Sequence, residues 1–534
     1  MNFNYTNSRR ESFHREVYYF GIVLLVISMP LSVFGMSLSQ FILAGNWILQ
    51  GQFRTKWEIL KQRKSIIVVL ALYALHLIWL FNTSDFDYAF KDLRIKLPLL
   101  ILPLIIGTSP WLGVKRMIGV IYFLAAALVV SSGISIAVFL GITGKEITDY
   151  REMSIFISHI RFSLIINVAV FFLFYLWLKK TVIKYSWERI AILMTALWLA
   201  VFLFILRSQT GLVIFGLINL FFALKFLIRR KGVIRWSVLV GLIIIAVVFG
   251  FNFNKAMKGY FHREPTGILD SFTVNGKPYK HNTSEMRYEN GFAVWNYYCL
   301  EEVKKEWEKR SKIDYLGKDE RGNTLYQTLV RYMASKGLRK DSLGMTQMSD
   351  EDIRSVEKGI PNYIYNSRFS LYAFLYKQFW IIDSYIQGDN PSGHSLTQRA
   401  EYLKAATAII ADNYWLGTGT GDVQKAFDQY YATHITPLEK QWQLRAHNQF
   451  VTFFLSFGFI GFILVLFILV YPVLYEKRIL DFWFMLPFIV ALVSFLNEDT
   501  LETQAGITFF TFFYAFFLFR EKENPELKKN GVLK

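Results

Sequence analysis

The sequence has almost no cysteine and no cluster of the other side chains that usually hold zinc. Cys299 is the single cysteine among 534 residues, which excludes an intrachain disulfide and any zinc site built on several thiolates. The sequence also has no glycine-rich loop followed by lysine and serine or threonine, which P-loop nucleotide enzymes need. A disulfide scaffold, thiolate-bound zinc and P-loop chemistry are therefore excluded.

Charged residues are few for the length of the chain, and apolar residues are many. Only 19% of residues are charged, whereas 53% are hydrophobic and 17% are aromatic, including 50 phenylalanines. The mean hydropathy is +0.30, and the apolar residues lie in long uninterrupted runs, which indicates a polytopic helical membrane protein. The net charge of +18 is then expected to come from basic cytoplasmic loops, and no nucleic acid partner is expected.

The first apolar run begins near Tyr18, after Arg9, Arg10 and Arg15. No small-x-small cleavage site follows it, so we expect a retained helix and not a signal peptide. The fold class predicted is all-α, with about twelve transmembrane helices. The expected spans are 18–34, 36–50, 65–81, 95–108, 117–140, 160–178, 190–206, 211–228, 236–253, 449–474, 482–496 and 505–519.

The basic residues of the short loops predict the orientation of these spans. Nearly all of them, such as Arg54, Lys61, Arg63, Lys477 and Arg478, fall on one side if the N-terminus is cytoplasmic, and this bias favours that orientation. Both termini are then cytoplasmic. The expected division is a transmembrane bundle over 1–253, a large outer loop domain over 254–446, and C-terminal transmembrane helices with a cytoplasmic tail over 447–534.

The outer loop is too long to lack structure. Its sequence has helical patterns at 301–312 and 396–412, and the aromatic stretch 363–386 is typical of a helix that lies along a membrane surface. We therefore expect a mostly helical loop domain.

Polar and charged residues gather at the ends of the spans that face outward. Arg207 lies in the turn between the seventh and eighth spans, and Arg161 opens the sixth. The others are Arg445, His447 and Asn448 before the tenth span, Glu498, Asp499 and Glu502 between the last two, His159 beside Arg161, and Lys91, Arg94 and Lys96 near the fourth. Arg207 could be a snorkelling anchor, His447 an ordinary interfacial histidine, and the acids could solvate a turn. Outer-face cations near carboxylates favour instead a site for a lipid-linked anion.

The loop adds one more arginine and a run of glycines. Arg399 lies in the first turn of the helix predicted over 396–412, where the helix dipole disfavours a cation. It either pairs with an acid such as Glu401 or one from elsewhere, or it faces an anion together with the first-turn N–H groups. Gly417, Gly419 and Gly421 indicate a tight loop that another group approaches closely.

Two Asp-x-Asp patterns have different interpretations. Asp350 and Asp352 fit the start of a helix, where carboxylates suit the dipole. Asp85 and Asp87 lie in an early outer loop, where some membrane glycosyltransferases bind a metal. Two carboxylates alone make a poor divalent site, so metal binding at this pair is the less favoured alternative.

These residues together resemble the superfamily of O-antigen ligases and polymerases. The resemblance is carried by three stretches: "NYWLGTGTGDVQKAF", "RAHNQFVTFFLSFGFIGF" and the arginine turn "RSQTGLVIFG". The glycines of the second stretch are Gly458 and Gly461. It implies a fold similar to the all-helical membrane glycosyltransferases. It also implies transfer of a glycan from undecaprenyl pyrophosphate outside the bacterial inner membrane, with inversion, without a metal and without a cofactor.

Carried over by position, the resemblance implies that Arg207 and Arg399 bind the donor pyrophosphate and that His447 is catalytic. Arg161 is a further candidate for the pyrophosphate. The supporting residues expected are Asn448, Arg445, Gly417, Gly419, Gly421 and Glu498.

The function predicted is that of an O-antigen ligase acting on the periplasmic face, with lipid A–core as acceptor and membrane lipid around it. A polysaccharide polymerase that uses the same donor and another glycan as acceptor is the first alternative. The alternative that is not an enzyme is a lipid-linked glycan flippase or transporter. A transport path usually shows an inverted repeat and charges near mid-span, and the sequence has no such repeat and few such charges.

Overall fold

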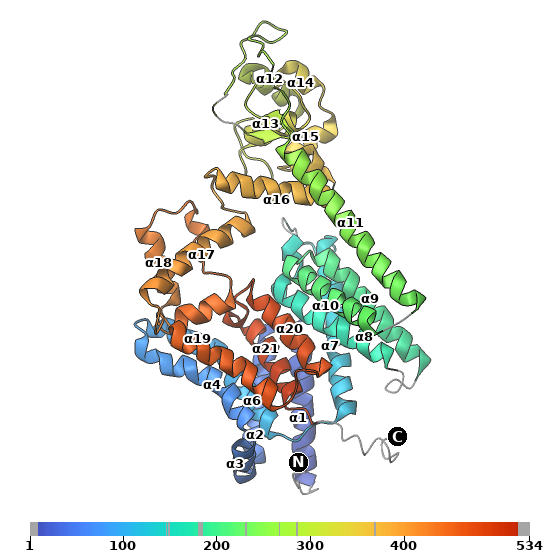
Figure 1. Ribbon diagram of the computed structural model, residues 1–534, viewed down its shortest axis with the longest axis vertical. Helices are drawn as coiled ribbons and strands as arrows, with labels where there is room; N and C mark the ends of the chain where they lie inside the picture. The colour runs from blue at the N-terminus through green and yellow to red at the C-terminus, as the bar shows by residue number, and fades with distance from the viewer. Residues whose placement is uncertain are drawn as a thin grey trace. The chain divides into compact units, whose positions relative to one another are not determined.

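The described part of the chain is mostly helical in the computed structural model (Figure 1). The structure describes residues 9–145, 147, 150–179, 185–229, 232–265, 267–282, 284, 287–367 and 370–521. The remainder of the two tails, residues 1–8 and 522–534, whose cytoplasmic placement is predicted, lies outside these ranges. The chain divides into two compact units, residues 1–222 with 398–534 and residues 223–397, and each is described by itself.

The first unit is a helical bundle, and most of its helices coincide with the expected spans. They are α1 (Arg9–Ser28), α2 (Val33–Gln50), α3 (Phe53–Gln62), α4 (Lys64–Ile78), α5 (Phe86–Lys96), α6 (Pro98–Thr108), α7 (Val114–Phe139), α8 (His159–Leu178), α9 (Ser186–Leu206), α10 (Gln209–Arg229), α17 (Ser395–Asp412), α18 (Val423–Thr433), α19 (Gln449–Tyr475), α20 (Phe482–Phe495) and α21 (Gln504–Leu518). The N-terminal end of α17 and the C-terminal end of α10 belong to the second unit by the division above.

Among the described residues, seven helices are long and apolar enough to cross a membrane. They are α4 with the 3₁₀ turn that follows it, α7, α8, α9, α10, α11 (Val233–Phe261) and α19. The chain is thus an all-α protein of membrane character, and the number of twelve spans stays a prediction. The expected span 95–108 is divided, because α5 ends at Lys96 and α6 begins at Pro98. With 11 residues, α6 is about 16 Å long, well short of a ~30 Å hydrocarbon layer.

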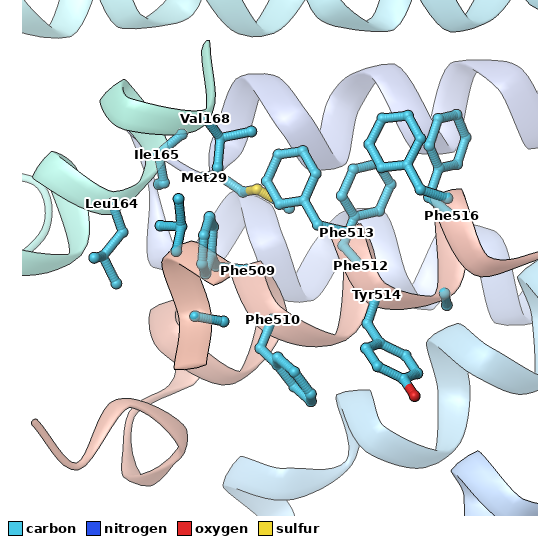
Figure 2. Packing of buried hydrophobic residues seen from close by; sticks show 14 of the residues in the cluster. Met29, Leu164, Ile165, Val168, Phe509, Phe510, Phe512, Phe513, Tyr514 and Phe516 are labelled. Atoms are coloured by element: carbon cyan, nitrogen blue, oxygen red, sulfur yellow. The ribbon is translucent and has the colours of Figure 1, made fainter. Parts of the chain in front are cut away.

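The core of the first unit surrounds α21. Every residue of this helix from Gly506 to Leu518 is buried, as expected of a helix that is apolar on all sides. It packs against α6, α20, α2 and α8, and Figure 2 shows its aromatic side chains among Met29, Ile165 and Val168. This packing fixes the turn that precedes α21, which carries several of the candidate site residues.

Helix α19 is interrupted at Gly458, whose backbone is in the left-handed region with φ 63°. The carbonyl oxygens of Leu455 and Ser456 accept hydrogen bonds from the backbone N–H groups of Thr418 and Gly419, at 2.7 and 3.0 Å. The glycine-rich loop therefore supplies the donors that the interrupted helix lacks.

The glycines of this loop are explained by close backbone contacts. A Cβ on Gly417 would lie 2.5 Å from Leu455 O, and one on Gly419 would lie 2.2 Å from Asn82 O. A Cβ on Gly421 would lie 2.2 Å from Asp85 O. The expected close approach is thus confirmed, and the approaching groups are backbone atoms of this chain.

The second unit has its own apolar core. Its helices after α11 are α12 (Leu300–Arg310), α13 (Leu325–Ser335), α14 (Ser342–Thr346), α15 (Asp350–Glu357) and α16 (Leu371–Ile386). Trp307, Leu329 and Tyr332 are among the fully buried core residues. The strands β1 (Tyr288–Glu289) and β2 (Phe292–Ala293) form an antiparallel hairpin. Asn290 and Gly291 turn between them with φ 50° and 95°, the Asn-Gly pattern that a two-residue hairpin loop prefers.

Several expectations for the loop are confirmed here. Helices α12 and α17 occupy the two helical patterns, and α15 begins at Asp350 with a reciprocal cap between Ser349 and Asp352. The aromatic stretch 363–386 forms a short 3₁₀ turn at Tyr363–Asn366 and then α16, and its place at a membrane surface stays a prediction. Cys299 is free and buried.

Candidate functional site

The site is built around the turn between α20 and α21. Glu498 lies in this turn with its side chain 6% exposed. Its Oε1 accepts a hydrogen bond from Arg399 Nη2 at 3.1 Å, and its Oε2 lies 3.6 Å from Arg161 Nη1. Arg161 Nη2 also donates to the backbone oxygen of Asp499 at 3.2 Å. One buried carboxylate therefore holds two of the predicted donor-binding arginines together.

The charges around Glu498 do not fully offset its burial. Burial raises the pKa of its carboxyl group, while Arg161, His447 and Arg399 oppose the rise. The Nε atom of Arg161 is buried and has no hydrogen-bond partner in the part of the chain that the structure describes. The arginines thus keep donor capacity that Glu498 does not use, and a bound anion could use it.

His447 lies immediately before the N-terminus of α19. Its backbone is in the left-handed region with φ 48°, which is uncommon for a residue other than glycine. Its ring lies 5.6 Å from the ring of Tyr402, centroid to centroid. It is also among the groups that act to lower the pKa of the Glu498 carboxyl. Within the described ranges no hydrogen bond to the imidazole is seen, so a substrate hydroxyl could use its nitrogen.

Helix α17 contributes two residues to this arrangement, one turn apart. Arg399 contacts Glu498, and Tyr402 packs on His447 while its hydroxyl donates to Trp442 O at 2.8 Å. Residues three apart lie on the same side of a helix. The same face of α17 therefore meets both the arginine–carboxylate cluster and the histidine.

Asn448 is a helix cap and not a partner of His447. Its Oδ1 accepts from the N–H groups of Phe450 and Val451 at 3.0 and 3.1 Å, and its Nδ2 donates to Leu496 O at 2.9 Å. The first contacts terminate α19. The last one ties that end of α19 to the end of α20, next to Glu498.

Arg207 is placed at the end of α9 in the left-handed conformation, with φ 52°. Its guanidinium carbon lies 5.7 Å from the centre of the Tyr150 ring. The turn is anchored nearby, because Asn497 Nδ2 donates to Thr210 Oγ1 at 2.7 Å. The segment with Arg207 is thus bound to the turn that carries Glu498.

Small polar residues near Arg207 account for the serine and glycine that follow it in the sequence. The hydroxyl oxygens of Ser163 and Ser208 are 2.9 Å apart, and Asn167 donates to Gly211 O at 3.0 Å. A Cβ on Gly211 would lie 2.5 Å from Ser163. These contacts pack α10 closely against α8 and fix the direction of the Arg207 turn.

Arg445 belongs to a second buried network. Its Nη2 lies 3.4 Å from Glu502 Oε2, and its Nη1 donates to Tyr88 Oη at 3.0 Å. Lys96 Nζ lies 3.0 Å from the same Glu502 oxygen and 2.6 Å from Asp92. Burial would raise the pKa of the Glu502 carboxyl, but Lys96 and Arg445 outweigh it and hold this pKa below its usual range. Arg445, which precedes α19, therefore links α5 to the turn before α21 through Tyr88 and Glu502. It does not pair with Glu498.

The structure therefore separates the predicted residues into groups. It brings Arg161, Arg399, Glu498 and His447 together, and it ties the Arg207 turn to them. The glycines pack the loop against α19 and the α4–α5 connection. Asp85 caps α5 by accepting from Tyr88 N–H at 2.9 Å, and no group of three or more His, Cys, Asp or Glu placed to hold a metal occurs in the described ranges.

Sequence reasoning missed Tyr402, Asn497 and Asp92. Asp92 and Lys96 are four residues apart, a spacing that signals a helical ion pair. Tyr402 follows Arg399 by three residues, so helical spacing could have shown that it shares the arginine's face. No sequence signal pairs Asn497 with Thr210.

A comparison with family models finds a similarity that covers part of this site. Residues 359–466 match the model described as O-antigen ligase. This segment of the chain is similar to the O-antigen ligase family. A comparison with curated proteins gave no match.

The O-antigen ligase match covers one part of the site and not the other. Arg399, the three glycines, Arg445, His447 and Asn448 lie inside residues 359–466, whereas Arg161, Arg207 and Glu498 lie outside. The apolar helices indicate a membrane protein, and the matched segment is similar to O-antigen ligases.

Proposed function

We propose that the protein is a glycosyltransferase that moves a glycan from undecaprenyl pyrophosphate to an acceptor sugar. The observation that supports this most is that Arg161 and Arg399 share the buried carboxylate of Glu498, while His447 packs against Tyr402 on the face of α17 that carries Arg399. Two clustered guanidinium groups are suited to a pyrophosphate, and a histidine beside them is suited to proton transfer.

The arginines bind and stabilise the leaving group in this proposal. Arg161 and Arg399 together carry two positive charges against the single negative charge of Glu498, so the cluster favours an anion such as the pyrophosphate, and Arg207 lies on the neighbouring turn. Because the leaving group keeps its negative charge as the bond breaks, preorganised guanidinium groups lower the barrier without a proton or a metal. Glu498 holds the two guanidinium groups in place before the donor arrives.

His447 activates the acceptor. The acceptor hydroxyl oxygen attacks the anomeric carbon, and a new glycosidic bond forms with inversion as the bond from that carbon to the phosphate oxygen breaks. The hydroxyl proton passes to the imidazole of His447, and undecaprenyl pyrophosphate leaves with the bonding electron pair. The left-handed backbone of His447 fits a residue that is held in place for such a task.

The acceptor is lipid A–core in a ligase and another lipid-linked glycan in a polymerase. Both reactions use the same donor chemistry, and we favour the ligase. The test is reconstitution of the full chain in lipid with a defined undecaprenyl-pyrophosphate-linked repeat. A ligase leaves this repeat unchanged until lipid A–core is added, whereas a polymerase lengthens it alone. Failure to transfer in both conditions with donor bound would contradict the function.

The proposal also includes the membrane arrangement. The protein spans the bacterial inner membrane about twelve times, with both termini cytoplasmic and the site on the periplasmic face. Residues 1–253 and 447–534 form the membrane part and residues 254–446 the periplasmic domain. Cysteine substitutions after removal of Cys299 test this directly: a cysteine at Lys425 should react with an impermeant maleimide from outside, and one at Lys61 should not.

A further inference from the structure

The second unit contains a cavity of about 280 Å³ between α16 and the segment that follows it. This volume is close to the lower limit of sites for small molecules, ~300–1,000 Å³. The cavity therefore has room for one compact ligand unit and not for an extended chain.

The cavity lining combines an aromatic ring with several kinds of hydrogen-bonding group. It includes the indole of Trp380, the phenol of Tyr385, the carboxylate of Asp389, the amide of Asn390 and the imidazole of His394. Ser384 adds a hydroxyl group. A flat apolar surface beside donors and acceptors suits a ligand with one apolar ring face and hydroxyl groups around its edge.

The two most distinctive lining groups are each held in place by contact with an arginine that is paired with a carboxylate. The Arg331 guanidinium lies 4.2 Å over the Trp380 ring and pairs with Glu289 at 2.6 Å, and Glu289 is completely buried. Asp389 is held by both terminal nitrogens of Arg287. Because these side chains are ordered before a ligand arrives, binding costs little additional conformational entropy.

The charges around the cavity disfavour a cation. The Asp389 carboxylate is already paired with Arg287. Burial, Lys377 and Arg331 lower the pKa of the His394 imidazole, so at neutral pH the ring is uncharged and offers one donor and one acceptor. A cation would meet Arg287, Arg331 and Lys377, and it would find no carboxylate in the lining that is not already paired.

We propose that this cavity is a saccharide subsite that binds one sugar residue of the glycan substrate, an inference that rests on the proposed transferase function. A sugar residue has the apolar ring face and the hydroxyl edge that the lining fits. Binding of a residue away from the reacting carbon would contribute to the choice of glycan.

The experiment is saturation-transfer NMR on the full-length protein in detergent, with methyl glycosides of glucose, galactose, N-acetylglucosamine and rhamnose as separate probes. The wild-type protein should give a saturation-transfer signal with at least one of these glycosides. Trp380→Ala should weaken that binding by about tenfold, and Trp380→Phe should restore part of it. Asn390→Ala, at an exposed position, should weaken it as well. Trp295→Ala is the matched control, because Trp295 is a half-buried tryptophan of the same unit outside the cavity.

The cavity and the transferase can fail separately in this design. If wild type gives no saturation-transfer signal with any glycoside, or if Trp380→Ala binds the glycosides as tightly as wild type does, the subsite is overturned. If glycoside binding depends on Trp380 but the protein transfers no glycan from the lipid-linked donor, the cavity is still a saccharide site. Only the transferase function is then contradicted.

Discussion

Arg399 and Glu498 are 99 residues apart in the sequence, and Arg399 Nη2 lies 3.1 Å from Glu498 Oε1. This contact explains how an arginine is tolerated in the first turn of α17, where the helix dipole disfavours a cation. The nearer acid, Glu401, contacts Lys404 instead. The first turn of α17 and the turn before α21 are thereby joined at the place where the proposed pyrophosphate binds.

Replacing the arginines by lysine should reduce turnover. A lysine keeps the charge but loses the planar pair of donors, so Arg207→Lys and Arg399→Lys should each cost roughly 1–3 kcal/mol of transition-state stabilisation. The measurement is kcat/KM for glycan transfer with a defined donor. Arg54→Lys is the control, since the Arg54 side chain is 95% exposed. Wild-type kcat/KM in both site variants would mean that these arginines only anchor helix ends.

His447→Ala should bind donor normally and transfer it slowly. The arginines remain in this variant, whereas the proton acceptor is lost, so single-turnover transfer should fall by about 10²–10⁴. His447→Gln should not restore it, because an amide does not take the proton. His434→Ala, at an exposed histidine of the same unit, is the control. If His447→Ala instead binds donor weakly and transfers bound glycan at the wild-type rate, His447 is a ligand and not a base.

Chelation of divalent metals should leave turnover nearly unchanged. The proposed leaving group is stabilised by arginines, so EDTA is expected to have little effect, and Asp85→Asn should be mild because asparagine also caps helices well. Transfer rates with and without EDTA check this. Loss of activity that Mg²⁺ or Mn²⁺ restores would support a metal at Asp85 and Asp87.

The stability of wild type relative to Glu498→Gln should depend on pH. Burial raises the pKa of the Glu498 carboxyl against the opposing charges of Arg161, His447 and Arg399, so the folded protein holds this proton more tightly than the unfolded chain. Lowering the pH from neutral toward the ordinary glutamate pKa of about 4.3 should therefore stabilise wild type relative to the variant. Melting temperatures of both proteins at several pH values measure the difference, and a change in the other direction would contradict the raised pKa.

Gly419→Ala should prevent docking of the glycine-rich loop. The backbone of Gly419 has φ 97°, and a Cβ there would lie 2.2 Å from Asn82 O, so the loss of stability should exceed the ~1 kcal/mol of an ordinary glycine replacement. Gly45→Ala is the control, because no atom lies within 4 Å of its Cβ position. Thermal stability in detergent is the measurement, and similar values for both variants would show that the loop can yield.

The sequence predicts local features well and distant contacts poorly. Apolar runs mark most helices to within a few residues, and the acids at 350–352 mark the start of α15, because both signals depend on neighbouring residues. The partner of Arg399 could not be chosen among the acids of the chain, since an ion pair between distant segments depends on packing. The division of the predicted span 95–108 at Pro98 shows the opposite case, in which an apolar run concealed a helix boundary.

Gly458 has a consequence for the order in which the protein is made. The first half of α19 completes its hydrogen bonds only with Thr418 and Gly419, and an interrupted helix in hydrocarbon needs such partners. Those residues precede α19 in the chain, so synthesis delivers them before the helix that depends on them. Insertion of α19 is therefore expected to finish late, after the preceding loop has docked, which makes assembly of this region sequential.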